Sequence, residues 1–213
     1  MVFMSKTRSL VTGIGLTVIG IGVIIYGMIL AFNMSRPPVD IYTVDWNTLK
    51  PYQHVEFDLD FLGGCYMIYE RDDVESSRFY AVPDIYATED GYVDIAHFMG
   101  VGVAKADFDK YEKVADSSYE WWMDETGTVE FGKETVHIDG YLRKMSSNDK
   151  KYMTKYLSED WGYNQSEIDQ IMTKYVIMTN GSSNTGIIIA GAVTLVAGLV
   201  FLGIAIVRMI KGR

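Results

Sequence analysis

Histidines and carboxylates are the residues of this sequence whose spacing could support acid–base chemistry or metal binding. His137 and Asp139 are two positions apart in an extended segment, so they share one strand face, where the carboxylate could orient the imidazole. Glu56, Asp58 and Asp60 line a strand face in the same way, with about 7 Å between successive carboxylates. Paired carboxylates can bind Ca²⁺ or exchange protons. Both patterns are also typical of a solvated polar strand face, and we predict neither a catalytic residue nor a metal ligand here.

Three other patterns could carry chemistry, and each lacks a required part. The histidines do not have the spacing of a zinc-binding H-E-x-x-H motif, and the single cysteine, Cys65, has no second thiol with which to bind zinc. His97 and Cys65 lie in apolar surroundings, so we expect a core histidine and a small buried side chain. Gly100 and Gly102 lack the third glycine of a dinucleotide-binding loop. The sequence predicts no catalytic residue, no metal ion and no cofactor, and favours a non-enzymatic protein.

Aromatic residues are the remaining candidates for a binding surface, with 15 Tyr, 9 Phe and 4 Trp in the chain. Adjacent side chains on a helix point about 100° apart, so we expect Trp122 in the core and Trp121 at the surface. Together with Trp161 and Tyr163, Trp121 forms the predicted partner surface. The alternative is that these aromatics pack in the core and anchor the domain near the membrane.

Two almost uncharged blocks, 10–32 and 186–207, predict membrane-spanning helices. They contain 23 and 22 residues, and each covers roughly 33 Å, enough to cross a hydrocarbon core of about 30 Å. The first block is longer than the apolar region of a cleaved signal peptide, about 7–15 residues, so we interpret it as a signal anchor. The predicted boundaries are a tail at 1–8, a membrane helix at 9–32, a domain at 33–185, a membrane helix at 186–207 and a tail at 208–213.

Basic residues beside the two predicted helices indicate how they cross the membrane. Lys6 and Arg8 precede the first helix, and three basic residues follow the second, whereas Arg36 stands alone on the other side. Cytoplasmic flanks carry an excess of Lys and Arg. We therefore predict a two-pass protein of the plasma membrane, with both termini in the cytoplasm and residues 33–185 outside it.

The predicted domain is strongly acidic. Residues 33–185 contain all 28 acidic residues and 14 of the 19 basic residues, which gives a formal net charge of −14. A surface of this charge repels a phosphate backbone, so we expect no nucleic acid among the partners.

Small residues recur along both predicted membrane helices. Gly13, Gly20 and Gly27 are seven residues apart, as are Gly15 and Gly22, and Gly186, Ala190, Thr194 and Gly198 recur every four residues. Because lipid supplies no hydrophobic force between helices, small residues mark close helix contacts. We predict a helix pair or a homo-oligomeric seam at these positions, and the alternative is that glycine is simply common in membrane helices. Neither helix has a charged residue in its interior, which argues against a channel or a pump.

Alternation and turn signals predict the elements of the domain. Strands are expected at 54–61, 65–69, 78–82, 92–104, 128–131, 135–145 and 175–178, with Pro83 ending the third. Helices are expected at 107–125, at 148–159 behind a capping box of Ser146 and Asp149, and after Ser166. Asp45 is expected to cap a short helical turn. The sum is an α+β fold, with a mostly antiparallel sheet and two or three helices, flanked by the two membrane helices.

Several short motifs make the sequence similar to a known kind of protein. They are Tyr66-x-x-Tyr69, Arg78-Phe79-Tyr80-Ala81-Val82-Pro83, Val101-Gly102-Val103 before Lys105, and Val136-His137-Ile138-Asp139-Gly140-Tyr141-Leu142. Over nearly its whole length the chain resembles an uncharacterised family of bacterial two-pass membrane proteins with an extracytoplasmic domain of unknown function. The resemblance implies a bacterial plasma membrane and carries over no catalytic residue.

The preferred interpretation is a non-enzymatic interaction or sensing domain outside the cytoplasm, with the lipid bilayer and a protein or a second copy as partners. One alternative is a membrane-surface hydrolase whose site is dispersed in the sequence. The other is a structural subunit that assembles through its membrane helices. A deep pocket with converging carboxylates and His97 or His137 would favour the hydrolase, and an exposed aromatic patch near Trp121 would favour binding.

Overall fold

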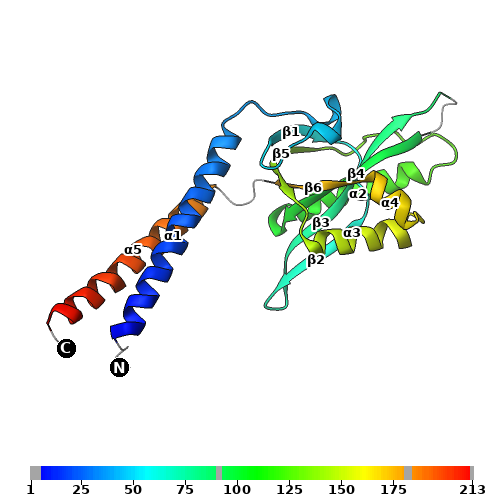
Figure 1. Ribbon diagram of the computed structural model, residues 1–213. Helices are drawn as coiled ribbons and strands as arrows, with labels where there is room; N and C mark the ends of the chain where they lie inside the picture. The colour runs from blue at the N-terminus through cyan, green and yellow to red at the C-terminus, as the bar shows by residue number, and fades with distance from the viewer. Residues whose placement is uncertain (1–5, 90–92, 180–183, 212–213) are drawn as a thin grey trace. The chain divides into compact units, whose positions relative to one another are not determined.

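The structure is a computed structural model that describes residues 6–89, 93–179 and 184–211. The chain divides into two compact units. One unit combines the two ends of the chain, Met1–Ser35 and Ser182–Arg213, and the other is the domain Arg36–Gly181. Figure 1 shows the two units.

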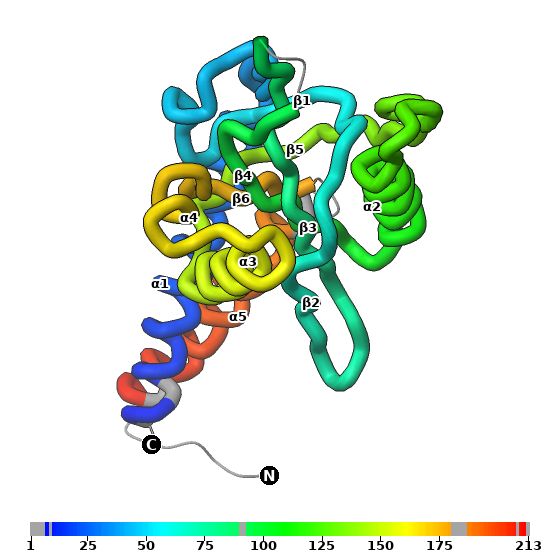
Figure 2. The backbone as a smooth tube through the Cα atoms, turned by 90° about the vertical axis from the view of Figure 1, so that its right-hand side faces the viewer, coloured from blue at the N-terminus to red at the C-terminus, as the bar shows by residue number. Residues whose placement is uncertain are grey.

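The first unit is a pair of long helices, α1 (Lys6–Met34) and α5 (Asn184–Ile210). They contain the apolar spans Leu10–Met34 and Ile187–Val207, each long and apolar enough to cross a membrane. The two helices pack side by side, as both views show (Figures 1 and 2). Two such helices near the two ends of the chain fit a two-pass membrane protein.

The domain is built on one mixed sheet, and the α+β class predicted from the sequence is confirmed. Its strands are β1 (His54–Leu59), β2 (Cys65–Arg71), β3 (Val74–Ala87), β4 (Val93–Ala104), β5 (Val136–Lys144) and β6 (Met172–Thr179). They lie in the order β1-β5-β6-β4-β3-β2. The prediction of a mostly antiparallel sheet needs correction at β6, which is antiparallel to β5 but parallel to β4. The residues between β4 and β6, 105–171, supply the long connection that a parallel pair of strands needs.

Helices cover both faces of the sheet. The described residues form five α-helices, of which α2 (Phe108–Trp122), α3 (Ser147–Glu159) and α4 (Gln165–Ile171) belong to the domain. Figure 2 shows α2 on one side of the strands and α3 and α4 on the other. Short 3₁₀ turns lie at Ile41–Thr43, Trp46–Thr48 and Lys105–Asp107.

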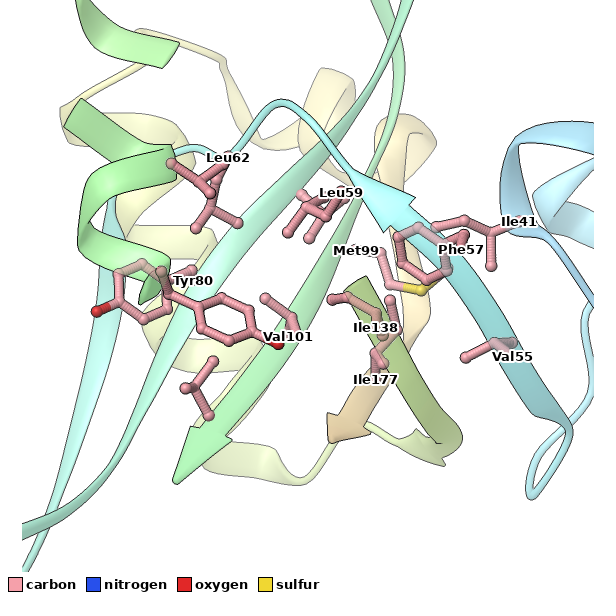
Figure 3. Close-up of a cluster of buried hydrophobic side chains, with 14 of the residues drawn as sticks. Ile41, Val55, Phe57, Leu59, Leu62, Tyr80, Met99, Val101, Ile138 and Ile177 are labelled. Carbon is pink, nitrogen blue, oxygen red and sulfur yellow. The ribbon is translucent and has the colours of Figure 1, made fainter. Parts of the chain in front are cut away.

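Each face of the sheet has its own apolar core. Alternate residues of β3 serve opposite faces, since Tyr80 and Val82 belong to the core under α2 while Phe79 and Ala81 belong to the core under α3 and α4. The first core also contains side chains of β1, β4, β5 and β6, several of which are shown in Figure 3. Because both faces are covered, the middle of β3 is buried at every position rather than at every second one.

Two sequence predictions about strands are wrong, for local reasons. Pro83 does not end its strand but lies within β3, opposite Phe98 of β4. The pairing of β3 with β2 stops at Tyr80, so the missing N–H of Pro83 interrupts no ladder on that side. The expected strand at 128–131 is instead a loop, because Asp124 accepts hydrogen bonds from the backbone N–H groups of Thr126, Thr128 and Val129.

Helix caps were predicted in part. The capping box of Ser146 and Asp149 is confirmed at the start of α3. The helix expected after Ser166 begins earlier, with Asn164 as its N-cap and Glu167 closing a capping box. Asp45 caps the turn at Trp46 by accepting from the N–H of Asn47, as the sequence predicts.

Tyr66 carries an unsatisfied hydroxyl in the second core. The residue is 7% exposed, and its Oη finds no hydrogen-bond partner among the described residues. Tyr66→Phe is therefore expected to raise the unfolding free energy by about 1 kcal/mol, since it removes a buried polar group without breaking a bond. Thermal unfolding of the purified full chain in uncharged detergent measures this.

Tyr156 provides the matched control for Tyr66, because its Oη accepts the backbone N–H of Gly64 at 2.6 Å. Tyr156→Phe leaves that donor unpaired and is expected to lower the unfolding free energy by about 1–2 kcal/mol. Equal destabilisation by the two substitutions would mean that the Tyr66 hydroxyl has a partner after all.

Candidate binding cleft

An open cleft of about 550 Å³ lies in the domain, beside the loop that joins β1 to β2. The loop contributes residues 61–64, β2 contributes Cys65, β3 contributes Tyr80, and α2 and the end of α3 supply the rest. The residues from these two helical segments are Glu112, Ala115, Asp116, Ser118, Tyr119, Trp122, Met123, Tyr156, Asp160 and Trp161. The cleft therefore joins parts of the chain that are far apart in sequence.

Hydrogen bonds fix the loop at the base of the cleft. The N–H of Leu62 donates to Ser118 Oγ on α2 at 2.9 Å, and the N–H of Gly64 donates to Tyr156 Oη on α3. A Cβ on Gly63 would lie 3.0 Å from the carbonyl oxygen of Ala81, so the loop runs too close to β3 for a larger residue. The walls of the cleft are thus tied to one another through this loop.

Three carboxylates line the cleft, and they differ in their partners. Glu112 Oε1 accepts hydrogen bonds from Arg78 Nη1 and from the Tyr80 hydroxyl, both at 2.6 Å. Burial and the hydrogen bond to Glu112 raise the pKa of Tyr80, which keeps its hydroxyl protonated as the donor. Asp116 and Asp160 are exposed and take part in none of the ion pairs formed by the described residues.

Aromatic rings form a continuous series along one wall. Trp161 packs edge-on against Phe98, with ring centroids 5.1 Å apart, and against Trp122 at 5.4 Å. Trp122 in turn contacts Phe61 at 6.1 Å. Because each ring is held by its neighbours, the wall presents rigid aromatic faces rather than loose side chains.

The structure separates the aromatic residues that the sequence had grouped. Trp121 is half-buried, packed edge-on against Phe61 and Phe131, whereas Trp122 is 42% exposed and lines the cleft. The expectation that Trp122 is the core residue is therefore wrong, because Phe131 packs on Trp121 with ring centroids 4.9 Å apart, whereas Phe61 contacts both tryptophans. Trp161 lines the cleft, and Tyr163 packs beside Phe98 in the second core instead.

The histidines lie outside the cleft and pair with carboxylates elsewhere. His137 pairs with two carboxylates of β1: its Nδ1 lies 2.8 Å from Asp58 Oδ1 and its Nε2 lies 3.3 Å from Glu56 Oε1. The hydrogen bond to Asp58 raises the pKa of His137 above its usual value. Asp139 pairs instead with Nε2 of His54 at 2.8 Å. These contacts make a cross-strand polar face on β1 and β5.

His97 and Asp60 complete the candidate groups. His97 stacks on Trp46, and its Nδ1 lies 3.3 Å from Asp84 Oδ2, so it is a partly buried paired histidine. Asp60 follows β1, and partial burial raises its pKa. Among residues 6–89, 93–179 and 184–211, no group of histidine, cysteine and carboxylate side chains could hold a metal ion.

Cys65 lies at the cleft and is exposed, which corrects the expectation of a buried thiol. The residue begins β2, which is an edge strand of the sheet formed by the described residues. Partial desolvation raises the pKa of the Cys65 thiol, so it is not an activated nucleophile.

The predicted helix-packing residues divide between the α1–α5 contact and the outer surface. An added Cβ would meet Leu202 at Gly13, Leu195 at Gly20, Ile188 at Gly27 and Thr17 at Gly198, all within 2.8 Å. Ala190 is exposed on α5. Gly186 lies in α5, but its surroundings are outside what the structure describes.

Sequence reasoning missed the carboxylates of the cleft. Glu112, Asp116, Tyr119 and Met123 are spaced by three and four residues on α2, which places them on one helix face. This spacing could have been used to predict a second face of α2, beside the apolar face that packs in the core. The approach of Asp160 and of residues 61–65 to this second face is set by the tertiary fold.

Comparison with known proteins gives one match. No curated protein and no solved structure matches the chain. A family model described as a domain of unknown function, DUF8577, matches residues 4–211, which is nearly the whole chain and includes both apolar helices and the domain. The resemblance to an uncharacterised family is thereby confirmed, and the chain belongs to the DUF8577 family.

Proposed function

We propose that this chain is a two-pass membrane protein that presents an acidic, non-enzymatic binding or sensing domain outside the cytoplasm. The observation that carries the proposal is the open cleft of about 550 Å³ with aromatic and carboxylate walls. A concave site that combines aromatic faces with a few polar groups is the usual form of a ligand site. Both apolar helices and the basic flanks of the sequence support the membrane topology.

The composition of the cleft supports binding over hydrolysis. In the part of the chain that the structure describes, no histidine lines it, and the Cys65 thiol at the cleft has a raised rather than a lowered pKa. Glu112 is already held by Arg78 and Tyr80, which leaves Asp116 and Asp160 as exposed carboxylates. Exposed carboxylates of this kind suit the recognition of a positively charged ligand.

Cysteine labelling in intact cells tests the topology. In a Cys65→Ser background, Lys151→Cys places a thiol on an exposed position of α3, and Lys211→Cys places one just beyond α5. We expect a membrane-impermeant maleimide to label the first variant in intact cells and the second only after the membrane is permeabilised. The opposite pattern, or labelling of both in intact cells, would contradict the proposed orientation.

A further inference from the structure

The cleft is preformed and has the size of a small-molecule site. Its volume of about 550 Å³ falls within the roughly 300–1,000 Å³ of typical ligand pockets. The loop at its base is bonded to Ser118 on one side and to Tyr156 on the other. A site whose walls are already connected loses little conformational freedom when a ligand enters.

Six aromatic side chains give the cleft its chemical character. They are Phe61, Tyr80, Tyr119, Trp122, Tyr156 and Trp161. The face of an aromatic ring carries negative electrostatic potential and attracts cations that shed water easily. Alkylated ammonium groups meet this condition, because their charge is spread over methyl or methylene groups that also pack well on the rings.

The charge of the cleft also favours a cationic ligand. Among the described residues, its lining contains three carboxylates and no lysine, arginine or histidine. Arg78, outside the lining, is shared by Glu75 and Glu112, whereas Asp116 and Asp160 take part in none of the ion pairs formed by the described residues. The segment 33–185, with its formal net charge of −14, attracts cations from a distance and repels anions.

We propose that this cleft binds the quaternary or tertiary ammonium group of a small organic cation, an inference that rests on the proposed binding function of the domain. The ammonium group lies against the aromatic wall around Trp122 and Trp161, and Asp116 and Asp160 balance its charge. A metal ion fits less well, because no cluster of three ligand side chains exists among the described residues. A primary ammonium, which needs several close acceptors, gains less from ring faces.

Calorimetric titration of the full chain in maltoside micelles with choline tests the proposal. We expect choline to bind with a dissociation constant at or below the millimolar range. The uncharged isostere 3,3-dimethylbutan-1-ol should bind at least about tenfold more weakly, since it lacks the charge that the rings and carboxylates attract. Equal binding of the alcohol, tighter binding of spermidine than of choline, or no heat with choline would each overturn the proposal.

Substitutions in the cleft locate the binding site. Asp116→Asn combined with Asp160→Asn, and separately Trp122→Leu, are each expected to weaken choline binding by about tenfold. Glu120→Gln is the matched control, because Glu120 lies on the same helix and outside the cleft lining. Unchanged affinity in both cleft variants, with unfolding temperatures like that of the control, would place the binding elsewhere and overturn the assignment.

Two sources could supply the ammonium group, a free solute or a lipid headgroup. If choline affinity falls in phosphatidylcholine nanodiscs relative to maltoside micelles, lipid headgroups compete for the cleft. If choline affinity is the same in nanodiscs and in micelles, the ligand is a free solute. Either result supports an ammonium group as the ligand. Choline binding to the purified chain does not depend on the orientation of the chain in a cell. If the chain shows the expected cysteine labelling but does not bind choline, the ligand proposal is overturned and the proposed topology is not affected.

Discussion

Replacing Gly20 with leucine is expected to separate α1 from α5. A Cβ at Gly20 would lie 2.5 Å from the backbone nitrogen of Leu195 and 2.7 Å from its Cα. Backbone atoms of a helix cannot swing aside as a side-chain tip can, so the helices must move apart along this contact. Because close approach is a main source of helix pairing in lipid, we expect the pair to lose about 2–3 kcal/mol.

Distances between spin labels on the two helices measure this separation. Val11→Cys and Val207→Cys in a Cys65→Ser background place labels on exposed positions of α1 and α5. Gly20→Leu should lengthen and broaden the distance distribution. Gly22→Leu is the matched control, since a Cβ at Gly22 meets nothing within 4 Å, and it should leave the distribution unchanged. An identical distribution in both variants would show that Gly20 is not at a tight contact.

The glycines of α1 show what spacing reveals and what it leaves open. Gly13, Gly20 and Gly27 lie against α5, while Gly15 and Gly22, which have the same seven-residue spacing, face open space. A heptad interval identifies residues that share a helix face. It does not identify the face that meets a partner, because that choice depends on side chains of the other helix.

Sequence prediction of the domain succeeded where one local signal dominated. The alternation of 54–61 gave β1, whose residues alternate between buried and exposed. Prediction failed where a distant or competing contact decided the outcome. Asp124 captures three backbone N–H groups and prevents a strand at 128–131, and β6 takes its place between β4 and β5 through pairings that no local pattern encodes.

The residues of the cleft show that predicting a binding site from the sequence has the same limit. The sequence identified Trp161 as a candidate contact but placed Trp121, rather than Trp122, beside it. On α2 these neighbours differ by one helical step, and their roles depend on Phe61 and Phe131, which come from other segments. A binding site made from four separate segments is therefore visible only once the fold has brought them together.

Asp149 is the buried charge on which the start of α3 depends. Its side chain is 1% exposed, its Oδ2 accepts from Arg143 Nη1 at 3.0 Å, and it closes the capping box with Ser146. Burial alone would raise the pKa of Asp149, but the hydrogen bonds from Arg143 and Ser146 outweigh burial and hold it below the usual value. The folded-state pKa is therefore below the unfolded one. The stability that results is present above the unfolded pKa of about 3.9 and is lost as pH falls through the folded pKa.

Arg143→Met is expected to destabilise the domain by about 2–3 kcal/mol at neutral pH, because it leaves the Asp149 carboxylate buried without its cation. The value lies below that of a fully buried pair, since the Arg143 side chain is 29% exposed.

Thermal unfolding of the full chain, followed by tryptophan fluorescence, measures the effect of Arg143→Met against Lys155→Met. The control breaks the exposed Lys155–Glu159 pair at 3.6 Å and should cost below about 1 kcal/mol. The difference in unfolding free energy between wild type and Arg143→Met should become smaller below about pH 4, because Asp149 of the variant then binds a proton and loses its uncompensated charge. If the difference in unfolding free energy between wild type and Arg143→Met stays constant with pH, Arg143 stabilises the domain by packing. If Arg143→Met lowers the unfolding free energy by no more than Lys155→Met does, the buried pair contributes no more than an exposed one.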